Sequence, residues 1–265
     1  MNTEKYCFMI KTVQTAVLRI LIEALKELLT DANFKITKDK IKLSTMDATH
    51  TVLVYLELLG SKFEYFYFDN SQSEYVIGVN LLNLFKLIKT TGTDDILTLS
   101  MEKKNTNILI VQIDNNEKNS RTIFKINLMD LDDKQMQIPP VTFETIITIP
   151  SSNFQKICRD MFNISDTIDI KCIDKHIIFK CEGDFASQET LMGEVDTGFS
   201  YIKNSDNVVQ GLFDLKYLVL FSKCTNLCGN INLYFKNDYP LILLYNVANL
   251  GNIKLALAPK FATTD

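Results

Sequence analysis

Eight basic residues recur at helical spacings and have the chemistry to contact phosphate groups. The pairs, three or seven residues apart, are Arg19 and Lys26, Lys86 and Lys89, Lys156 and Arg159, and Lys216 and Lys223. Such spacings place both members of a pair on one face of a helix. The contact they offer to a polyanion is electrostatic and independent of sequence. The competing interpretation is that these are ordinary solvated helix faces.

Carboxylates offer a second kind of chemistry, metal ligation. The candidate groups are Asp47 with His50, and Asp130 with Asp132 and Asp133. The second group falls in a segment without rigid support, and the chain contains only two histidines. A metal-dependent enzyme is therefore the weaker interpretation. We expect no catalytic residue, no metal site and no cofactor.

The cysteines point to a reduced environment. The six cysteines are Cys7, Cys158, Cys172, Cys181, Cys224 and Cys228. None of them forms a CxxC pair, which argues against a zinc site. The chain is large and shows no secretory signal, so we expect buried thiols in an intracellular protein that is not secreted. No apolar run approaches the roughly 20 residues that cross a bilayer, so we expect no membrane partner.

Positive charge is concentrated where helices are expected. The 265-residue chain has a net charge of −4, whereas a protein that simply coats nucleic acid is basic overall. The expected helices hold eight basic and four acidic residues (Glu23, Glu27, Asp160 and Asp214), so they carry +4 and the rest of the chain carries −8. If the protein binds a polyanion, its basic groups must therefore be gathered on one surface, and the helices are the candidates for that surface.

Apolar periodicity predicts four helices that position the basic residues. They are expected over about 13–28, 81–89, 150–161 and 214–223, the third with a capping hydroxyl in Pro150-Ser151-Ser152. Short runs rich in β-branched and aromatic residues predict strands between them. These runs are 34–36, 41–44, 52–58, 63–68, 96–101, 108–113, 122–128, 143–149, 168–173, 176–181, 189–195, 231–235, 241–247 and 253–257.

The segment from Met129 to Pro140 interrupts this pattern. It is acidic at first and ends in two prolines, which favours an exposed linker. The order helix, strands, helix, strands occurs once on each side of it. The pattern predicts two similar α+β domains, 1–128 and 141–265, joined by a connector at 129–140.

Several short motifs resemble the proliferating cell nuclear antigen family of DNA sliding clamps. They are Glu23-Ala24-Leu25-Lys26, Ser44-Thr45-Met46-Asp47-Ala48-Thr49-His50, Gly78-Val79-Asn80-Leu81, Leu128-Met129-Asp130-Leu131-Asp132, Phe154 with Ile157-Cys158-Arg159-Asp160, and Ala258-Pro259-Lys260. These motifs follow the family's order along nearly the whole chain. The chain therefore resembles a clamp from a large DNA virus or a divergent eukaryote.

The resemblance implies an α+β fold of two clamp domains, each with two helices packed on antiparallel sheets. Three chains would form a pseudo-sixfold homotrimeric ring that encircles double-stranded DNA and acts as a DNA polymerase processivity factor. The eight basic residues named above would face the channel. Implied partners are DNA polymerase, a clamp loader and other proteins with short peptide motifs, at a nuclear or viral replication site.

The resemblance also assigns two protein-binding surfaces. A pocket for partner peptides would comprise Met46, His50, Leu53, Met136, Ile138, Pro240, Ala258 and Pro259. The subunit interface would pair strands 122–128 and 176–181 through Ile123, Phe124, Ile126, Ile177, Phe179 and Cys181. Two alternatives keep the fold but change the assembly: a subunit of a heterotrimeric checkpoint-type clamp, or a monomeric polymerase accessory protein.

Overall fold

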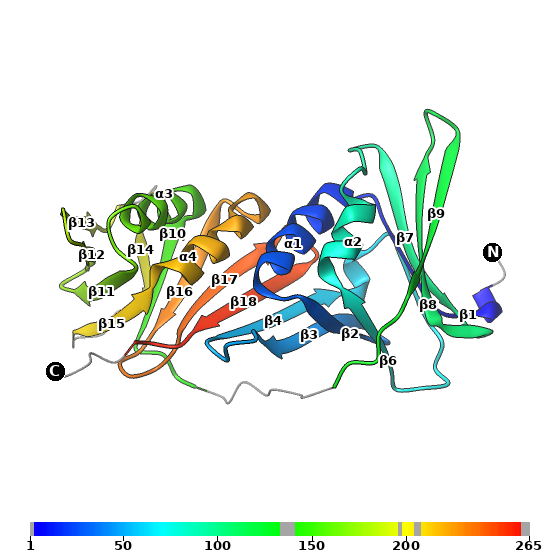
Figure 1. The fold of residues 1–265 in the computed structure, drawn as a ribbon, viewed down its shortest axis with the longest axis horizontal. Helices are drawn as coiled ribbons and strands as arrows, with labels where there is room; N and C mark the ends of the chain where they lie inside the picture. Colours follow the sequence, from blue (N-terminus) through cyan, green and yellow to red (C-terminus); the bar gives the residue numbers. More distant parts are fainter. Residues whose placement is uncertain (1–2, 133–140, 196–197, 204–207, 261–265) are drawn as a thin grey trace. The chain divides into compact units, whose positions relative to one another are not determined.

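The computed structural model describes residues 3–132, 141–195, 198–203 and 208–260 (Figure 1). The chain divides into two compact units, which are described separately. Unit 1 comprises Met1–Thr45, Tyr55–Met136 and Val247–Asn252; unit 2 comprises Met46–Val54, Gln137–Asn246 and Ile253–Asp265. Each unit contributes residues to strands β4 (Val52–Leu59) and β18 (Gly251–Leu257), so the division is not a single cut in the sequence.

Unit 1 contains helices α1 (Thr15–Leu28) and α2 (Leu81–Ile88), which lie side by side (Figure 1). The apolar repeat of α1 buries Leu21 and Leu25 almost completely. Helix α2 begins after Asn80, whose side chain accepts a hydrogen bond from the N–H of Asn83 at 3.0 Å. The periodic pattern thus located both helices to within two residues.

The strands of unit 1 form antiparallel layers in the orders β5-β1-β7-β8-β9 and β6-β2-β3-β4. Side chains alternate between core and solvent along β2, as expected for a half-buried strand. The bounds are β1 (Tyr6–Thr12), β2 (Asp31–Thr37), β3 (Lys40–Met46), β5 (Tyr65–Phe68), β6 (Glu74–Asn80), β7 (Asp95–Glu102), β8 (Asn105–Asn115) and β9 (Ser120–Asn127), with 3-10 turns at Thr3–Lys5 and Gly60–Lys62.

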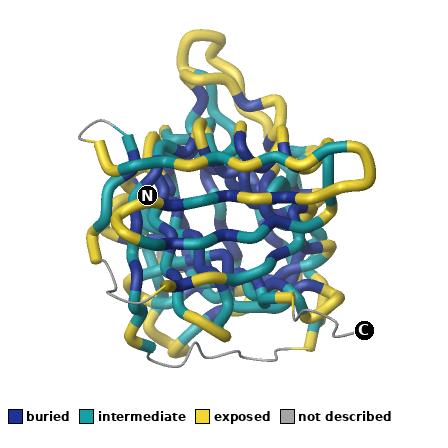
Figure 2. Tube along the Cα trace, turned by 90° about the vertical axis from the view of Figure 1, so that its left-hand side faces the viewer, coloured by how far each residue is buried: buried dark blue, intermediate teal, exposed yellow. Residues whose placement is uncertain are grey.

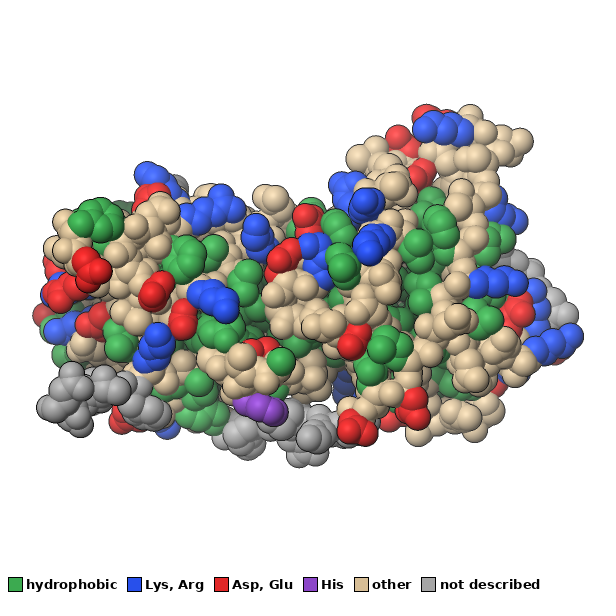
Figure 3. Space-filling view, viewed as in Figure 1, with side chains coloured by type: hydrophobic (Ala, Val, Ile, Leu, Met, Phe, Trp, Pro, Cys, Tyr) green, Lys and Arg blue, Asp and Glu red, His purple; other side chains and the backbone are tan. Residues whose placement is uncertain are grey.

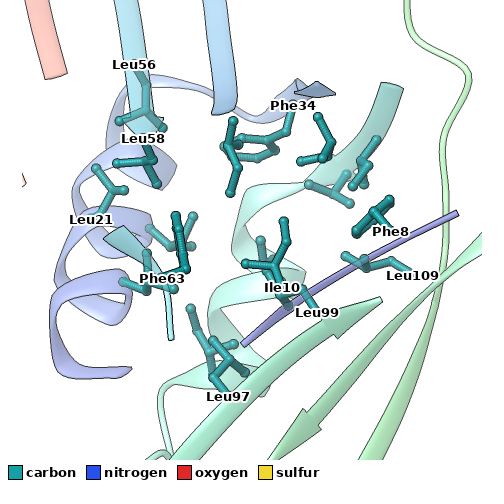
Figure 4. Close-up of a pocket in the computed structure, with 18 residues that line it drawn as sticks. Phe8, Ile10, Leu21, Phe34, Leu56, Leu58, Phe63, Leu97, Leu99 and Leu109 are labelled. Atoms are coloured by element: carbon teal, nitrogen blue, oxygen red, sulfur yellow. The ribbon is translucent and has the colours of Figure 1, made fainter. Parts of the chain in front are cut away.

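The core of unit 1 contains a cavity of about 80 Å³ (Figure 4). Only apolar side chains line it, among them Leu21 from α1, Phe8 and Ile10 from β1, and Val79 from β6. Native cores hold few voids of this size, because apolar side chains normally interdigitate. The side chains around this cavity are therefore packed less densely than in a typical protein core.

Unit 2 contains helices α3 (Ser151–Phe162) and α4 (Leu215–Phe221), which also lie side by side (Figure 1). The predicted capping hydroxyl of α3 is wrong. Pro150 occupies the N-cap position without a side-chain bond, and the Ser151 hydroxyl donates to the carbonyl oxygen of Cys228 at 2.7 Å. Helix α4 is shorter than predicted, because the chain tightens into a 3-10 turn over Ser222–Leu227.

The strands of unit 2 are antiparallel in the orders β13-β12-β11-β15 and β14-β10-β16-β17-β18. Their bounds are β10 (Thr145–Pro150), β11 (Thr167–Ile173), β12 (His176–Glu182), β13 (Ser187–Gly193), β14 (Ser200–Lys203), β15 (Val209–Asp214), β16 (Asn230–Phe235) and β17 (Leu241–Val247).

Buried aromatic side chains hold unit 2 together. The rings of Phe154 on α3 and Phe179 on β12 meet edge to face, 6.4 Å apart between centroids, and both residues are fully buried. Figure 2 shows the buried positions in dark blue and, at its top, the exposed tip of the β8–β9 hairpin in yellow. No helix within the described ranges is long and apolar enough to span a membrane.

The start of the predicted connector is attached to unit 1. The N–H of Met129 donates to the carbonyl oxygen of Gly78 on β6 at 2.8 Å, and the Asn33 side chain donates to the carbonyl oxygen of Leu131 at 3.1 Å. A Cβ at position 78 would lie 2.2 Å from the Met129 carbonyl oxygen, so only glycine permits this approach. Residues 133–140 of the connector lie outside the described residues.

Candidate nucleic-acid interface and partner surface

Two of the basic residues of unit 1 are held by neighbouring groups. Arg19 is half-buried, and its Nη1 donates to the carbonyl oxygen of Thr91 at 3.0 Å. Lys26 pairs with Glu27, and its Nζ lies 5.1 Å from the centroid of the Phe85 ring. These two cations are therefore engaged within the protein, and we expect them to contribute less to a phosphate surface than their charge suggests.

The other six basic residues are exposed, and none forms an ion pair with any described residue. They are Lys86 on α2, Lys89 at its C-cap, Lys156 and Arg159 on α3, Lys216 on α4 and Lys223 in the 3-10 turn that follows. Figure 3 shows Lys and Arg side chains over the helices of each unit. The spacing of seven does not place Lys216 and Lys223 on one α-helical face, because α4 ends at Phe221.

These cations can neutralise phosphates without reading bases. Lysine carries its charge on a long flexible stem, so several of them can follow a polyanion that moves. The arrangement thus supports non-specific electrostatic contact with a phosphate backbone.

A tight loop precedes β4 and is organised by Asp47. The Asp47 carboxylate accepts hydrogen bonds from the N–H groups of Thr51 at 2.8 Å and Val52 at 2.7 Å, and from the Thr49 hydroxyl. Burial alone would raise the pKa of Asp47, but these hydrogen bonds outweigh it and hold the pKa below its ordinary value. The segment Ser44 to His50, one of the motifs that resemble the clamp family, thus ends in a turn held by the Asp47 carboxylate. Within this turn His50 takes a φ of 57°.

The loop and the C-terminal segment of the described chain are joined. The N–H of Ala258 donates to the carbonyl oxygen of Thr51 at 3.1 Å. Predicted pocket residues stand on both sides of this bond: His50 is exposed on the loop, while Leu53, Ala258 and Pro259 are half-buried.

The remaining predicted pocket residues lie at or next to the ends of other strands, or outside the described residues. Met46 ends β3, and Pro240 stands directly before β17; both are half-buried. Met136 and Ile138 lie outside the described residues. The pocket as a whole therefore stays a prediction, although two of its segments lie together.

One half of the predicted subunit interface is wrong. Strand β12 lies between β11 and β13, so the backbone groups on both of its edges are already paired. Ile177, Phe179 and Cys181 are buried in unit 2, with exposed fractions of 0%, 0% and 3%. A strand in this position cannot pair with another chain.

The edge of that sheet is β13, the next strand along the chain. It carries Leu191, which is 59% exposed, and Glu189, which is also exposed. In unit 1, β9 lies at a sheet edge, with Ile123 52% exposed and Phe124 and Ile126 half-buried. The resemblance assigned the interface to strand 176–181 and not to the next predicted strand, 189–195. The pattern of residues could not correct this, because interior and edge strands share the same alternation.

The carboxylates and cysteines considered as metal ligands or nucleophiles can be located in the structure, apart from Asp133, which lies outside the described residues. The described residues contain no group of three or more His, Cys, Asp or Glu side chains placed to hold a metal. All six cysteines are free; Cys228 is half-buried and the others are buried. Burial raises the pKa of Cys224 to about 12, so this thiol stays protonated and unreactive at neutral pH.

The fold and the exposed helix cations fit a sliding clamp, and comparison with known proteins shows the class and its family. The family model of the proliferating cell nuclear antigen N-terminal domain matches residues 7–135, and that of the C-terminal domain matches residues 137–260. The chain belongs to the proliferating cell nuclear antigen family, a family of non-catalytic scaffolds, and its function is that of a DNA polymerase processivity factor.

Two similar proteins support this assignment along the whole chain. The "Probable DNA polymerase sliding clamp 1" of Paramecium bursaria Chlorella virus 1 is 35% identical over 263 residues, which cover 98% of this chain and 99% of that protein. The crystal structure of the proliferating cell nuclear antigen of Entamoeba histolytica superposes with a TM-score of 0.88 at 26% identity, covering 97% of this chain and 100% of that one. Clamps of this family work with DNA and polymerase in general.

Proposed function

We propose that three copies of this chain close into a ring around duplex DNA, with β9 of one copy paired antiparallel to β13 of the next. The observation that carries this proposal is the presence of two long strand edges that expose apolar side chains. Unpaired edges invite pairing with another chain. A contact between two different surfaces of one chain closes into a ring when each step turns by 120°.

The competing edges are shorter or already occupied. Met129 bonds to β6, and Lys260 forms a bridge to Leu212 on β15. Within the described ranges, strands β5 and β14 have four residues each, whereas β9 has eight and β13 has seven. Strands β9 and β13 are therefore the edges best matched in length and availability.

Charge favours the same pairing. Strand β9 carries Lys125 and also Arg121, which pairs with Asp114 on β8, and β13 carries Glu189. Lys125 has no ion-pair partner among the residues that the structure describes. Opposite charge on the two edges would steer the encounter and disfavour pairing of β9 with another β9.

In such a ring the helices would surround the DNA. Twelve helices spaced about 9–10 Å apart make a circle roughly 36 Å across, and removing one helix diameter leaves a hole of about 25 Å. A duplex passes through this hole with room for water and ions. The exposed cations of α2, α3, α4 and the following turn would then act on phosphates, with Arg19 and Lys26 contributing less.

We further propose that partners dock beside the connector 129–140, the segment that joins clamp domains 1–128 and 141–265 in the sequence. The loop around Asp47 and the segment 258–260 would form one part of the pocket, and Met136 and Ile138 the other. A short peptide with one helical turn and apolar anchors suits such a surface. Polymerase, a clamp loader and other replication proteins are the proposed carriers of such peptides, at a nuclear or viral replication site.

The solution mass measured by light scattering tests the ring, in the wild type and in variants that exchange the charges of Glu189 and Lys125. Wild-type protein is expected at three times the chain mass of 30.3 kDa at micromolar concentration. Glu189→Lys should shift dissociation to a roughly tenfold higher concentration, because it opposes the cations of β9. Adding Lys125→Glu to that variant should restore the trimer.

A matched control is Glu23→Lys, which makes the same charge change on α1. It should leave the mass unchanged at every concentration. A wild-type monomer at all accessible concentrations would overturn the ring, and failure of Lys125→Glu to restore it would overturn the choice of edges.

A further inference from the structure

Helix α4 and the strand before it contact both segments of the partner surface within unit 2. The Tyr217 hydroxyl lies 2.9 Å from Oγ1 of Thr49 in the Asp47 loop. On the other side, the N–H of Lys260 donates to the carbonyl oxygen of Leu212 at 2.8 Å. One short stretch, 212–217, therefore touches both the loop and the C-terminal segment.

The donors in the Thr49 contact can be assigned. The Thr49 hydroxyl contacts the Asp47 carboxylate and also Oγ1 of Thr51 at 3.0 Å. The Asp47 carboxylate only accepts hydrogen bonds, so the Thr49 hydroxyl gives its single proton to Asp47, and the Thr51 hydroxyl is the donor in its contact with Thr49. Thr49 Oγ1 is then left as an acceptor for Tyr217. The result is a directed chain from the Tyr217 O–H through the Thr49 hydroxyl to the Asp47 carboxylate, in which each bond polarises the next.

Asp214 links the start of α4 to the C-terminal segment through its two carboxylate oxygens. Its Oδ1 accepts from the N–H of Lys216 at 3.0 Å and caps α4, while its Oδ2 lies 3.4 Å from Nζ of Lys260. The side chains are 24% and 44% exposed, so the ion pair is partly screened, but it adds to the backbone bond of Lys260. The start of α4 and the end of the described chain are thus held together.

Neighbouring residues of α4 face different surroundings. Lys216 is exposed on the proposed phosphate-contacting side, and its Nζ lies 5.6 Å from the Tyr217 ring centroid. Tyr217 is half-buried and reaches the loop. A helix proposed to line the channel therefore also supports the loop.

We propose that Tyr217 and Asp214 are positioning residues for the partner pocket, fixing the Asp47 loop and the segment 258–260 in the conformation that receives a peptide. This inference rests on the proposed partner surface and adds to it two residues that contact no peptide themselves. A loop held before binding loses less conformational freedom on binding, and so binds more tightly.

Tyr217→Phe tests the loop half of the proposal, because it removes one hydroxyl and keeps the ring. Isothermal titration should use a synthetic peptide of the pattern Gln-x-x-aliphatic-x-x-aromatic-aromatic. We expect the affinity to fall about fivefold, the size of one lost hydrogen bond. Thr49→Val should cause at least as large a loss, because it also removes the hydrogen bond from Thr49 to Asp47. Thr49→Ser should retain wild-type affinity, and Tyr217→Phe combined with Thr49→Val should be no weaker than Thr49→Val alone.

Amide hydrogen exchange gives a readout that needs no peptide. In Tyr217→Phe, the amides of Thr51 and Val52, which donate to Asp47, should exchange faster than in the wild type while the melting temperature stays within a few degrees. The matched control is Tyr201→Phe, which removes a hydroxyl that donates to the carbonyl oxygen of His176 at 2.9 Å. It should change neither loop exchange nor peptide affinity.

Asp214→Asn tests the other half and should lower peptide affinity about twofold to threefold, as expected for an exposed ion pair. Unchanged loop exchange in Tyr217→Phe, or faster exchange with unchanged affinity, would overturn the positioning role of Tyr217. Unchanged affinity in Asp214→Asn would overturn that of Asp214. Failure of the wild-type protein to bind the peptide would instead overturn the partner surface itself. Because hydrogen exchange is measured without peptide, it tests the support of the loop separately from the partner surface.

Discussion

The guanidinium of Arg19 on α1 donates to the carbonyl oxygen of Thr91, just beyond the end of α2, at 3.0 Å. The Thr15 hydroxyl makes a parallel contact with the carbonyl oxygen of Gly92 at 2.9 Å. Two carbonyls beyond the C-terminal end of α2 are therefore satisfied by side chains of α1. Arg19 thus joins the two helices of unit 1, although its spacing with Lys26 suggested only a phosphate contact.

This contact predicts that Arg19 matters more for stability than for DNA. Arg19→Met keeps an apolar stem but removes the donors, leaving the carbonyl of buried Thr91 without this partner. The free energy of unfolding should fall by about 1–2 kcal/mol in urea titrations. Lys86→Met, on the exposed face of α2, should change it by less than about 0.5 kcal/mol. Equal effects of the two substitutions would contradict the structural role of Arg19.

The exposed cations of α2 should matter more for DNA binding than for stability, in contrast to Arg19. Lys86→Glu with Lys89→Glu should reduce polymerase stimulation on primed circular DNA, because four units of charge change on the proposed phosphate side. The control is Lys38→Glu with Lys104→Glu, the same charge change on exposed lysines between strands. Only the first variant should lose stimulation, and both should keep the wild-type mass. Equal stimulation by the two variants at moderate salt would show that α2 does not face DNA.

The sequence was most informative where periodicity and burial agree. The apolar stripe of α1, with Leu21 and Leu25, and that of α3, with Phe154 and Met161, located these helices because one face of each is fully buried. Strand β1 escaped notice because Cys7 to Ile10 are all buried, so no alternation marks them. The segment Gly78-Val79-Asn80 looked like a helix start, yet it ends β6, and Asn80 serves both as strand end and N-cap.

The site was only partly predictable for related reasons. Helical spacing finds the exposed face, but it cannot reveal that Arg19 and Lys26 are engaged by Thr91 and Phe85, since those contacts depend on tertiary packing. The sequence does not reveal the order of strands in a sheet either, so the interface is predicted on β12, whereas the structure has β13 at the edge. Tyr217 was missed because its partner Thr49 lies 168 residues away in the chain.

The Asp47 loop should respond to acid in a defined direction. The pKa of Asp47 is lowered from its ordinary value of 3.8, so the ionised form is stabilised by folding. Its contribution is fully present above that value and is lost as the pH falls through the lower folded-state pKa. The stability gap between wild type and Asp47→Asn should be about 2 kcal/mol at pH 7 and pH 5, and should narrow below about pH 4. Urea unfolding at pH 7, 5 and 3 measures it; a gap of constant size would contradict the assignment.

The cavity in unit 1 predicts that a larger core side chain will stabilise the protein. A void of about 80 Å³ costs up to about 2 kcal/mol at 24 cal/mol per Å³. Val79 lines the void and is 1% exposed, so Val79→Ile can place one additional methylene in it. We expect the free energy of unfolding to rise by about 0.5–1 kcal/mol, the value of one buried methylene.

The control for this prediction is Val209→Ile on β15 of unit 2, where the side chain is fully buried and does not line the void. At this fully buried position, which does not line the cavity of unit 1, the same extra methylene should lower the free energy of unfolding by about 1 kcal/mol, the cost of overpacking. Urea titrations of both variants at one protein concentration keep any effect of subunit association equal. Destabilisation by Val79→Ile to the same extent as by Val209→Ile would show that the core of unit 1 is as fully packed in solution as that of unit 2.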